Sequence, residues 1–188
     1  KYHHELSDIE LSLKTIRERS ENLLTFMDDY RKLVKIPQPK PENFDIREKM
    51  RSILHLFKAE LENIQIEQTY DHKMILADPV LFEQVMVNLV TNCIQAFSHT
   101  NKPAISINFS HTNKWMKLTV RDNGSGMDQD TLSRALIPFY TTKETGSGIG
   151  LSLVQQIINL HRGKVQIESE VNSYTQITLL FPLDHTVK

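Results

Sequence analysis

The chain has 188 residues, of which 39% are hydrophobic and 24% are charged, and these proportions are typical of a globular protein with its own core. Its 22 basic and 23 acidic residues give a net charge of -1, which offers no broad electrostatic argument for binding nucleic acid or an anionic membrane. The single cysteine, Cys93, excludes an internal disulfide and a cysteine-rich zinc site. No apolar run approaches the roughly 20 residues of a membrane span, and no signal peptide is visible, so we expect a cytoplasmic chain.

The first part of the chain predicts a long helix with a narrow apolar seam. Ser20 fills the one polar position of a seam whose apolar members are spaced three and four apart: Leu6, Ile9, Leu13, Ile16, Leu23, Met27, Tyr30 and Val34. This spacing favours a coiled coil or helical bundle over a helix that lies on its own domain. The proline-rich segment 36–41 ends the helix and forms a stiff linker. We therefore predict one unit over residues 1–41 and a second over residues 42–188.

The remainder of the chain predicts an α+β fold. Asp45 can cap a helix that runs to about residue 62, the pair Asp78-Pro79 opens a helix to about residue 97, and a third helix is expected over residues 148–161. Alternating apolar residues predict six strands, at 64–70, 74–77, 104–110, 115–120, 164–169 and 175–181. Antiparallel hairpins on one side and helices on the other would form a two-layer α/β sandwich.

Two glycine runs predict a nucleotide site. The strand at 115–120 would deliver Asp122 to a sheet edge, where its carboxylate can accept a hydrogen bond from an exocyclic amine, while the glycines of the run 122–126 permit close backbone approach. The second run, 146–150, opens a helix whose free N–H groups and positive dipole end favour an anion such as phosphate. Neither run has the GxGxxG or GxxxxGK[ST] pattern, which disfavours Rossmann and P-loop sites. Either run alone is also compatible with a turn before a helix.

The helix predicted over residues 79–97 carries a stripe of amides. Asn88 and Asn92 are four residues apart, and Gln84 and Gln95 extend the same face of an otherwise apolar helix. Amide oxygens are hard donors of the kind that suits Mg²⁺, which bridges nucleotide phosphates through few protein ligands. The alternative interpretation is that these amides simply face solvent.

Four motifs occur in one order along the chain: Asn88-x-x-x-Asn92, Asp122-x-Gly124-x-Gly126, Pro138-Phe139-Tyr140-Thr141-Thr142-Lys143 and Gly146-x-Gly148-x-Gly150-Leu151. Their order and spacing resemble the N, G1, F and G2 boxes of sensor histidine kinases, within the wider group of ATPases that includes gyrase, Hsp90 and MutL. The resemblance covers about residues 42–183 and implies a Bergerat-type ATP-binding fold. The short lid, together with the segment before Pro37, resembles the nitrogen-regulation subgroup, in which that segment is the second helix of the dimerisation hairpin.

The resemblance implies roles for individual residues. Asp122 would bond the adenine amino group, Asn92 would coordinate Mg²⁺, and Asn88 would lie beside the phosphates. Lys143 would touch the γ-phosphate from a mobile lid, so that Asn88, Asn92 and Lys143 are the expected catalytic residues. The phosphates would be cradled by Gly146, Ser147, Gly148, Ile149, Gly150 and Leu151. Further contacts to the nucleotide would come from Gln95, Gly124, Gly126, Thr141, Thr142 and, through water, Thr175.

The position of Asn88 bears on the reaction. Hydrolysing relatives have a glutamate there that activates water, and an amide cannot take that proton. The resemblance therefore implies transfer of the ATP γ-phosphoryl to a histidine, for relay to an aspartate in the receiver domain of a response regulator. The intact kinase would be a homodimer, and this chain would contact neither nucleic acid nor membrane. The alternatives are a nucleotide-driven clamp ATPase of the same fold and a non-catalytic interaction module that works through the heptad helix.

No phosphoacceptor histidine is expected in this chain. His4-Glu5-Leu6 lacks the proline that follows the acceptor histidine in the family, so the chain should bind nucleotide without phosphorylating itself. The other histidines have no metal-ligand spacing and are predicted to be surface or partly packed residues: His55, His72, His99, His111, His161 and His185.

Overall fold

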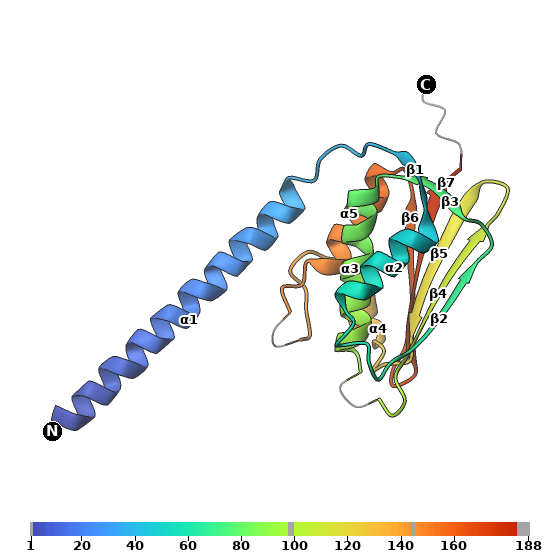
Figure 1. Cartoon of the computed structure of the whole chain (residues 1–188). Coiled ribbons are helices and arrows are strands. Elements are labelled where there is room, and N and C mark those ends of the chain that lie inside the picture. The colour runs from blue at the N-terminus through green and yellow to red at the C-terminus, as the bar shows by residue number, and fades with distance from the viewer. Residues whose placement is uncertain (1, 98–99, 144–145, 184–188) are drawn as a thin grey trace. The chain divides into compact units, whose positions relative to one another are not determined.

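The computed structural model describes residues 2–97, 100–143 and 146–183, and the chain divides into two compact units, residues 1–36 and 37–188. The first unit is a single helix, α1 (Tyr2–Val34), as the heptad spacing predicts (Figure 1). The seam residues with described side chains are 42–62% exposed in the single chain: Leu13, Ile16, Leu23, Met27, Tyr30 and Val34. The side chains of His4, Leu6 and Ile9 lie outside the described residues, and pairing of this helix in a coiled coil stays a prediction.

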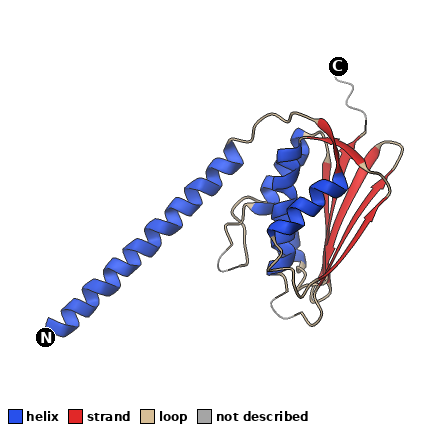
Figure 2. Cartoon of the chain, in the orientation of Figure 1, coloured by secondary structure: helices blue, strands red, loops and turns tan. Residues whose placement is uncertain are grey.

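The second unit is a two-layer sandwich, as the sequence predicts. Its five-stranded sheet has the order β2-β4-β5-β7-β6, and helices cover one face (Figures 1 and 2). The strands of this sheet are β2 (Gln65–Tyr70), β4 (Ala104–His111), β5 (Trp115–Asp122), β6 (Lys164–Glu170) and β7 (Tyr174–Pro182). A second sheet pairs β1 (Glu42–Asp45) with β3 (Met74–Ala77). The helices are α2 (Ile46–Leu56), α3 (Pro79–Gln95), α4 (Gln129–Arg134) and α5 (Gly150–Leu160).

Local sequence signals explain where the main helices begin. Asp45 Oδ1 accepts the Arg47 N–H at 2.9 Å and caps α2. Asp78 Oδ1 accepts the N–H groups of Val80 at 2.9 Å and Leu81 at 3.0 Å, and a proline occupies the first turn of α3. Both predicted helix starts are therefore confirmed. None of the helices in the described ranges is long and apolar enough to cross a membrane.

The core lies between the sheet and the antiparallel pair α3 and α5. One side of α3 is buried in this core, and its buried residues are Leu81, Phe82, Val85, Met86, Leu89, Val90 and Cys93. On α5, Leu153, Val154, Ile157 and Ile158 are at most 3% exposed and face the same core. Since Gly150 at the start of α5 lies next to Asn88 and Asn92, while His161 at its end bonds to Asp78 at the start of α3, the two helices run in opposite directions. Both glycine runs lie against α3 of this pair.

Several sequence predictions are corrected by the fold. Helix α2 ends at Leu56, six residues earlier than expected, because residues 57–63 form turns that reverse the chain into β2. Strand β2 pairs parallel with β4, whereas only antiparallel hairpins were expected. The short elements β1 and α4 are not predicted from the sequence. Asp122 does not lie on a sheet edge: β5 is the central strand, and Asp122 is paired with Ile105 on one side and Thr175 on the other.

Candidate functional site

Asp122 is a buried carboxylate at the end of the central strand. Along β5 every second residue faces the helices, so Asp122, which is 5% exposed, continues the buried series of Met116, Leu118 and Val120. Burial raises the pKa of Asp122 above its usual value, and the Gly124 N–H, which donates to Oδ1 at 2.9 Å, opposes that rise. A carboxylate in this position requires polar partners, and an exocyclic amine is a suitable one.

The glycine run after Asp122 lies between the C-terminal end of α3 and the β6–β7 turn and is hydrogen-bonded to both. The Ser125 N–H donates to Ala96 O at 3.0 Å, and its carbonyl accepts the Asn172 N–H at 2.7 Å. A Cβ on Gly124 would lie 2.6 Å from the Ala96 Cβ. Gly126 has φ +63°, and a Cβ there would lie 2.0 Å from the Glu170 carbonyl oxygen. The loop therefore approaches both neighbours more closely than any side chain would allow.

The second glycine run leads into an uncapped helix. Helix α5 begins at Gly150 without a side-chain hydrogen bond to its first N–H groups, and the Ser152 hydroxyl instead donates to Ile149 O at 2.8 Å. A Cβ on Gly150 would lie 3.1 Å from Asn88 Oδ1 and 3.8 Å from Asn92 Nδ2. The positive end of α5 thus opens beside the two asparagines of α3, where an anion would be stabilised.

The two asparagines of α3 do not simply face solvent, whereas Gln95 is exposed. Asn88 is half-buried, and its Nδ2 donates to Gln84 O at 2.7 Å, so its Oδ1 is the atom turned toward Gly150. Asn92 Nδ2 is buried and has no hydrogen-bond partner within the described residues. A buried amide N–H without a hydrogen-bond partner is expected where a ligand supplies the missing acceptor. The Asn88 Oδ1 beside this uncapped helix also matches the hard oxygen donors that Mg²⁺ prefers.

The lid segment contacts both α3 and the start of α5. The Phe139 N–H donates to Gly148 O at 2.9 Å, and both residues have positive φ. The Lys143 ammonium donates to Gln95 Oε1 at 2.7 Å, at the C-terminal end of α3. Partial burial of this ammonium lowers the pKa of Lys143, although the residue as a whole is exposed, and Asp122 opposes the shift. Contact of Lys143 with a γ-phosphate stays a prediction.

All the residues expected at the site lie on five segments: the second half of α3, the end of β5 with the loop after it, the lid, the start of α5 with the glycine run before it, and β7. Thr175 is 7% exposed and pairs with Asp122 across β5 and β7. Its hydroxyl lies 3.1 Å from Ser169 Oγ, which also accepts the Met127 N–H at 2.8 Å. Ser169 was not predicted at the site, because long-range pairing alone brings it to the loop after Asp122.

Four histidines of the second unit, His55, His72, His111 and His161, fall outside this site. His161 is 4% exposed, its Nε2 accepts the Asp78 N–H at 3.1 Å, and its Nδ1 lies 2.8 Å from Ile157 O, so the prediction of a surface or partly packed residue is wrong here. His72 and His111 stack edge to face, with ring centroids 4.0 Å apart. Within residues 2–97, 100–143 and 146–183 no group of three or more histidine, cysteine or acidic side chains could hold a metal. His99 and His185 lie outside the described residues.

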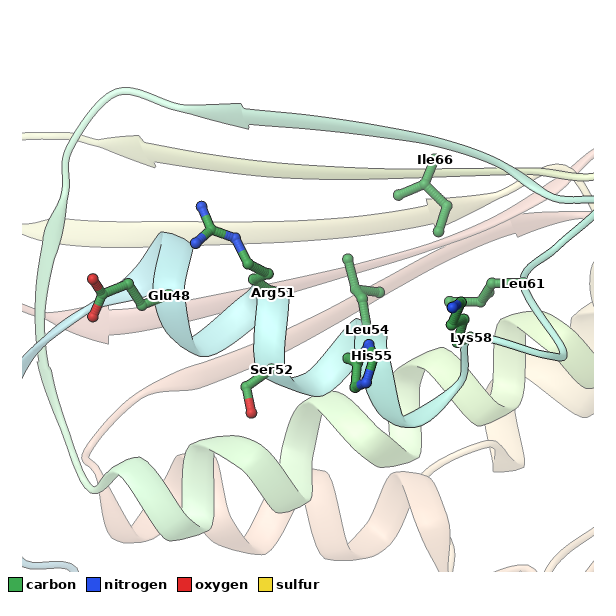
Figure 3. A pocket seen from close by; sticks show the side chains of 8 residues that line it. All are labelled: Glu48, Arg51, Ser52, Leu54, His55, Lys58, Leu61 and Ile66. Carbon is green, nitrogen blue, oxygen red and sulfur yellow. The ribbon is translucent and has the colours of Figure 1, made fainter.

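A separate hollow of about 660 Å³ lies between α2 and β2 (Figure 3). It is lined by Glu48, Arg51, Ser52, Leu54, His55, Lys58, Leu61 and Ile66. None of the residues expected to bind nucleotide lines it, since those residues gather at α3, α5 and the end of β5. The candidate site is therefore defined by backbone groups, amides and one carboxylate, and not by this hollow.

Known protein sequences include relatives of this chain. Residues 77–185 match the family described as histidine kinase-, DNA gyrase B-, and HSP90-like ATPases. The sensor histidine kinase ZraS of Escherichia coli K12 is 34% identical over 132 residues, which are 69% of this chain and 28% of ZraS. A Rickettsia bellii protein whose name describes an NtrY-like sensor histidine kinase is 26% identical over 182 residues, 96% of this chain and 30% of its own length. The chain thus spans less than a third of these curated relatives.

Solved structures share the fold of the second unit. The catalytic domain of the histidine kinase ThkA, free of nucleotide, superposes with a TM-score of 0.68 at 27% identity, over 76% of this chain and 95% of that domain. ThkA in complex with the response regulator protein TrrA gives a TM-score of 0.71 at 22% identity, over 90% of this chain and 50% of that one. The predicted two-layer ATP-binding fold is therefore confirmed.

Proposed function

This chain belongs to the histidine kinase-, DNA gyrase B- and HSP90-like ATPase family, and on that premise we propose that it is the ATP-binding catalytic portion of a sensor histidine kinase. In the whole protein it transfers the γ-phosphoryl of ATP to a histidine, for relay to an aspartate in a response regulator receiver domain. Residues 1–41 supply the second helix of the dimerisation hairpin and its linker, and residues 42–188 form the catalytic domain of a cytoplasmic, homodimeric kinase.

One observation carries this proposal: a buried carboxylate and an uncapped helix end lie along the same helix. The loop of Asp122 contacts α3 at Ala96, and the uncapped end of α5 contacts it at Asn88. Eight residues separate these points, or about 12 Å at the rise of an α-helix. Such a span suits a ligand with an amino-bearing base at one end and phosphates at the other.

The chemical groups at the two ends of this span suit different parts of the nucleotide. Asp122 accepts from the adenine amine and fixes the base, while the first N–H groups of α5 bind phosphate oxygens. Asn92 would hold Mg²⁺, with Asn88 beside it, and the bound ion would neutralise phosphate charge. Because the amide of Asn88 cannot accept a proton from water, the site positions the γ-phosphoryl for another acceptor and does not promote hydrolysis. Steady-state hydrolysis by the isolated chain would instead support a clamp ATPase of the same family.

The experiment is calorimetric titration of ADP and a non-hydrolysable ATP analogue with Mg²⁺, on the wild type, Asp122→Asn and the exposed control Asp71→Asn. We expect binding to the wild type and the control, and a loss of more than tenfold in Asp122→Asn, since a hydrogen bond to a charged group is worth about 1.5–3 kcal/mol. Absence of binding to folded wild type would refute the proposal, and the interaction-module alternative would replace it.

Asp122→Asn should keep its fold. Burial raises the pKa of Asp122, so the ionised carboxylate is disfavoured in the folded state at any pH above its unfolded pKa of about 4. A neutral amide removes this penalty and can still accept from the Gly124 N–H. We expect the variant to be at least as stable as the wild type at pH 7, with the difference vanishing below about pH 4. Urea unfolding of both proteins at the two pH values tests this sign.

A further inference from the structure

Three polar side chains form a row across the neighbouring strands β6, β7 and β5. Ser169 on β6 is paired with Thr175 on β7, and Thr175 is paired with Asp122 on β5. All three belong to the alternate residues that face the helices, and on β7 this series continues with the buried apolar residues Ile177 and Leu179. Side chains directly opposite one another in a sheet have Cβ atoms about 4.5–5.5 Å apart. Thr175 is therefore the direct neighbour of both Ser169 and the Asp122 carboxylate.

The hydrogen bonds of Ser169 fix the direction of the proton on Thr175. A hydroxyl has one hydrogen to donate and two lone pairs. The Ser169 hydroxyl donates its hydrogen to Tyr174 O at 2.8 Å, because a carbonyl oxygen only accepts, and it accepts the Met127 N–H at 2.8 Å. Its other lone pair is left for the Thr175 hydroxyl, whose oxygen lies 3.1 Å away. In this last contact Thr175 must therefore be the donor.

The Thr175 hydroxyl is consequently an acceptor toward any ligand. Its one hydrogen is used on Ser169, so only lone pairs remain for a ligand or for a water that a ligand holds. The neighbouring Asp122 carboxylate, when ionised, also only accepts. Asp122 and Thr175 thus present two acceptors side by side, on residues that are 5% and 7% exposed. An exocyclic amine carries two N–H donors and is complementary to this pair, whereas an oxo group in its place would face acceptors alone.

We propose that Ser169 is a positioning residue for base selectivity, which holds the Thr175 hydroxyl as an acceptor so that the site prefers adenine over a base with an oxo group in place of the amine. This inference rests on the proposed function, because it assumes that Asp122 and Thr175 meet the base of the bound nucleotide. Ser169 acts only through Thr175. A purely structural role, in which Ser169 supports the loop through the Met127 N–H, would weaken all nucleotides alike.

The experiment compares the affinities of ADP and inosine diphosphate, whose base carries an oxo group in place of the amine, by calorimetry with Mg²⁺. Ser169→Ala removes the acceptor of the Thr175 proton, so this hydroxyl can rotate and donate to the oxo group. We expect the ADP preference to fall about three- to tenfold, as for one neutral hydrogen bond. The preference should stay within about twofold of wild type in Ser169→Thr, which keeps a hydroxyl, and in Ser106→Ala, on the opposite face of the sheet.

The same substitution in a Thr175→Val background tests whether Ser169 acts through Thr175. Without the threonine hydroxyl there is no proton to direct, so Ser169→Ala should then change the ADP preference by less than about twofold. Thermal unfolding without nucleotide reports any change in stability separately. Ser169→Cys, whose sulfur is a weak acceptor, replaces the alanine variant if that variant does not fold.

The outcomes separate the inference from its premise. A wild type that prefers ADP, together with an alanine variant of equal preference, overturns the role of Ser169 and leaves the proposed function standing. A fall in preference that is equally large in the Thr175→Val background also overturns it, because Thr175 then does not transmit the effect. A wild type that binds both diphosphates equally overturns the adenine contact of Asp122 and the inference with it.

Discussion

Replacement of Gly126 by alanine should destabilise the second unit by about 3 kcal/mol. Gly126 has φ +63°, a conformation that costs an L-residue about 1 kcal/mol. Its new Cβ would lie 2.0 Å from the Glu170 carbonyl oxygen, so the loop must move away from the β6–β7 turn. That movement breaks the bonds from the Asn172 N–H to Ser125 O (2.7 Å) and from the Met127 N–H to Ser169 Oγ (2.8 Å), each worth about 1 kcal/mol.

Urea unfolding followed by tryptophan fluorescence measures this loss in the second unit alone, because the one tryptophan, Trp115, lies in β5. Gly146→Ala is the matched control. Its Cβ would meet the Thr141 hydroxyl at 2.5 Å, but a short side chain can rotate away, and we expect a loss below about 1 kcal/mol. Equal losses in the two variants, or a Gly126→Ala protein as stable as wild type, would refute the reasoning. The ADP affinity of Gly126→Ala should also fall, because the displaced loop directly follows Asp122.

Three further predictions follow from single contacts. Gly150→Ala places a methyl group 3.1 Å from Asn88 Oδ1, so calorimetry should show at least tenfold weaker ADP binding while the unfolding free energy changes by less than about 1 kcal/mol. Burial of Asp78 favours its neutral form, but hydrogen bonds from three backbone N–H groups prevail and lower its pKa, so the cap stabilises the fold above the unfolded pKa. Asp78→Ala should therefore lose about 1 kcal/mol at pH 7, and this difference from wild type should shrink in urea titrations as the pH falls below about 4. His161→Ala should lower the free energy of unfolding by about 2–3 kcal/mol in the same assay. The substitution creates a cavity, and it also removes the acceptor of the buried Asp78 N–H. A loss below about 0.5 kcal/mol would contradict the packing described.

The sequence by itself determined those features that depend on a few neighbouring residues. The caps Asp45 and Asp78 marked two helix starts because their side chains bond N–H groups only two or three positions ahead. Strand β3 and most of β5 followed from period-two alternation, which reports which side of a sheet is buried. The glycine runs and Asp122 indicated a candidate site, because glycine marks positions where the backbone approaches a neighbour closely.

Only the tertiary structure decided the features that depend on residues far apart in the chain. The parallel pairing of β2 with β4, the central place of β5 and the short strand β1 follow from partners that α2, α3 and long turns separate. His161 meets Asp78 across 83 positions, through the packing of α3 on α5. Local sequence patterns do not predict such contacts. Each contact depends on which helices pack on the sheet and on the loop entropy that is lost when distant residues come together. The sequence therefore revealed the chemical groups of the site, and the packed layers decided which of those groups touch.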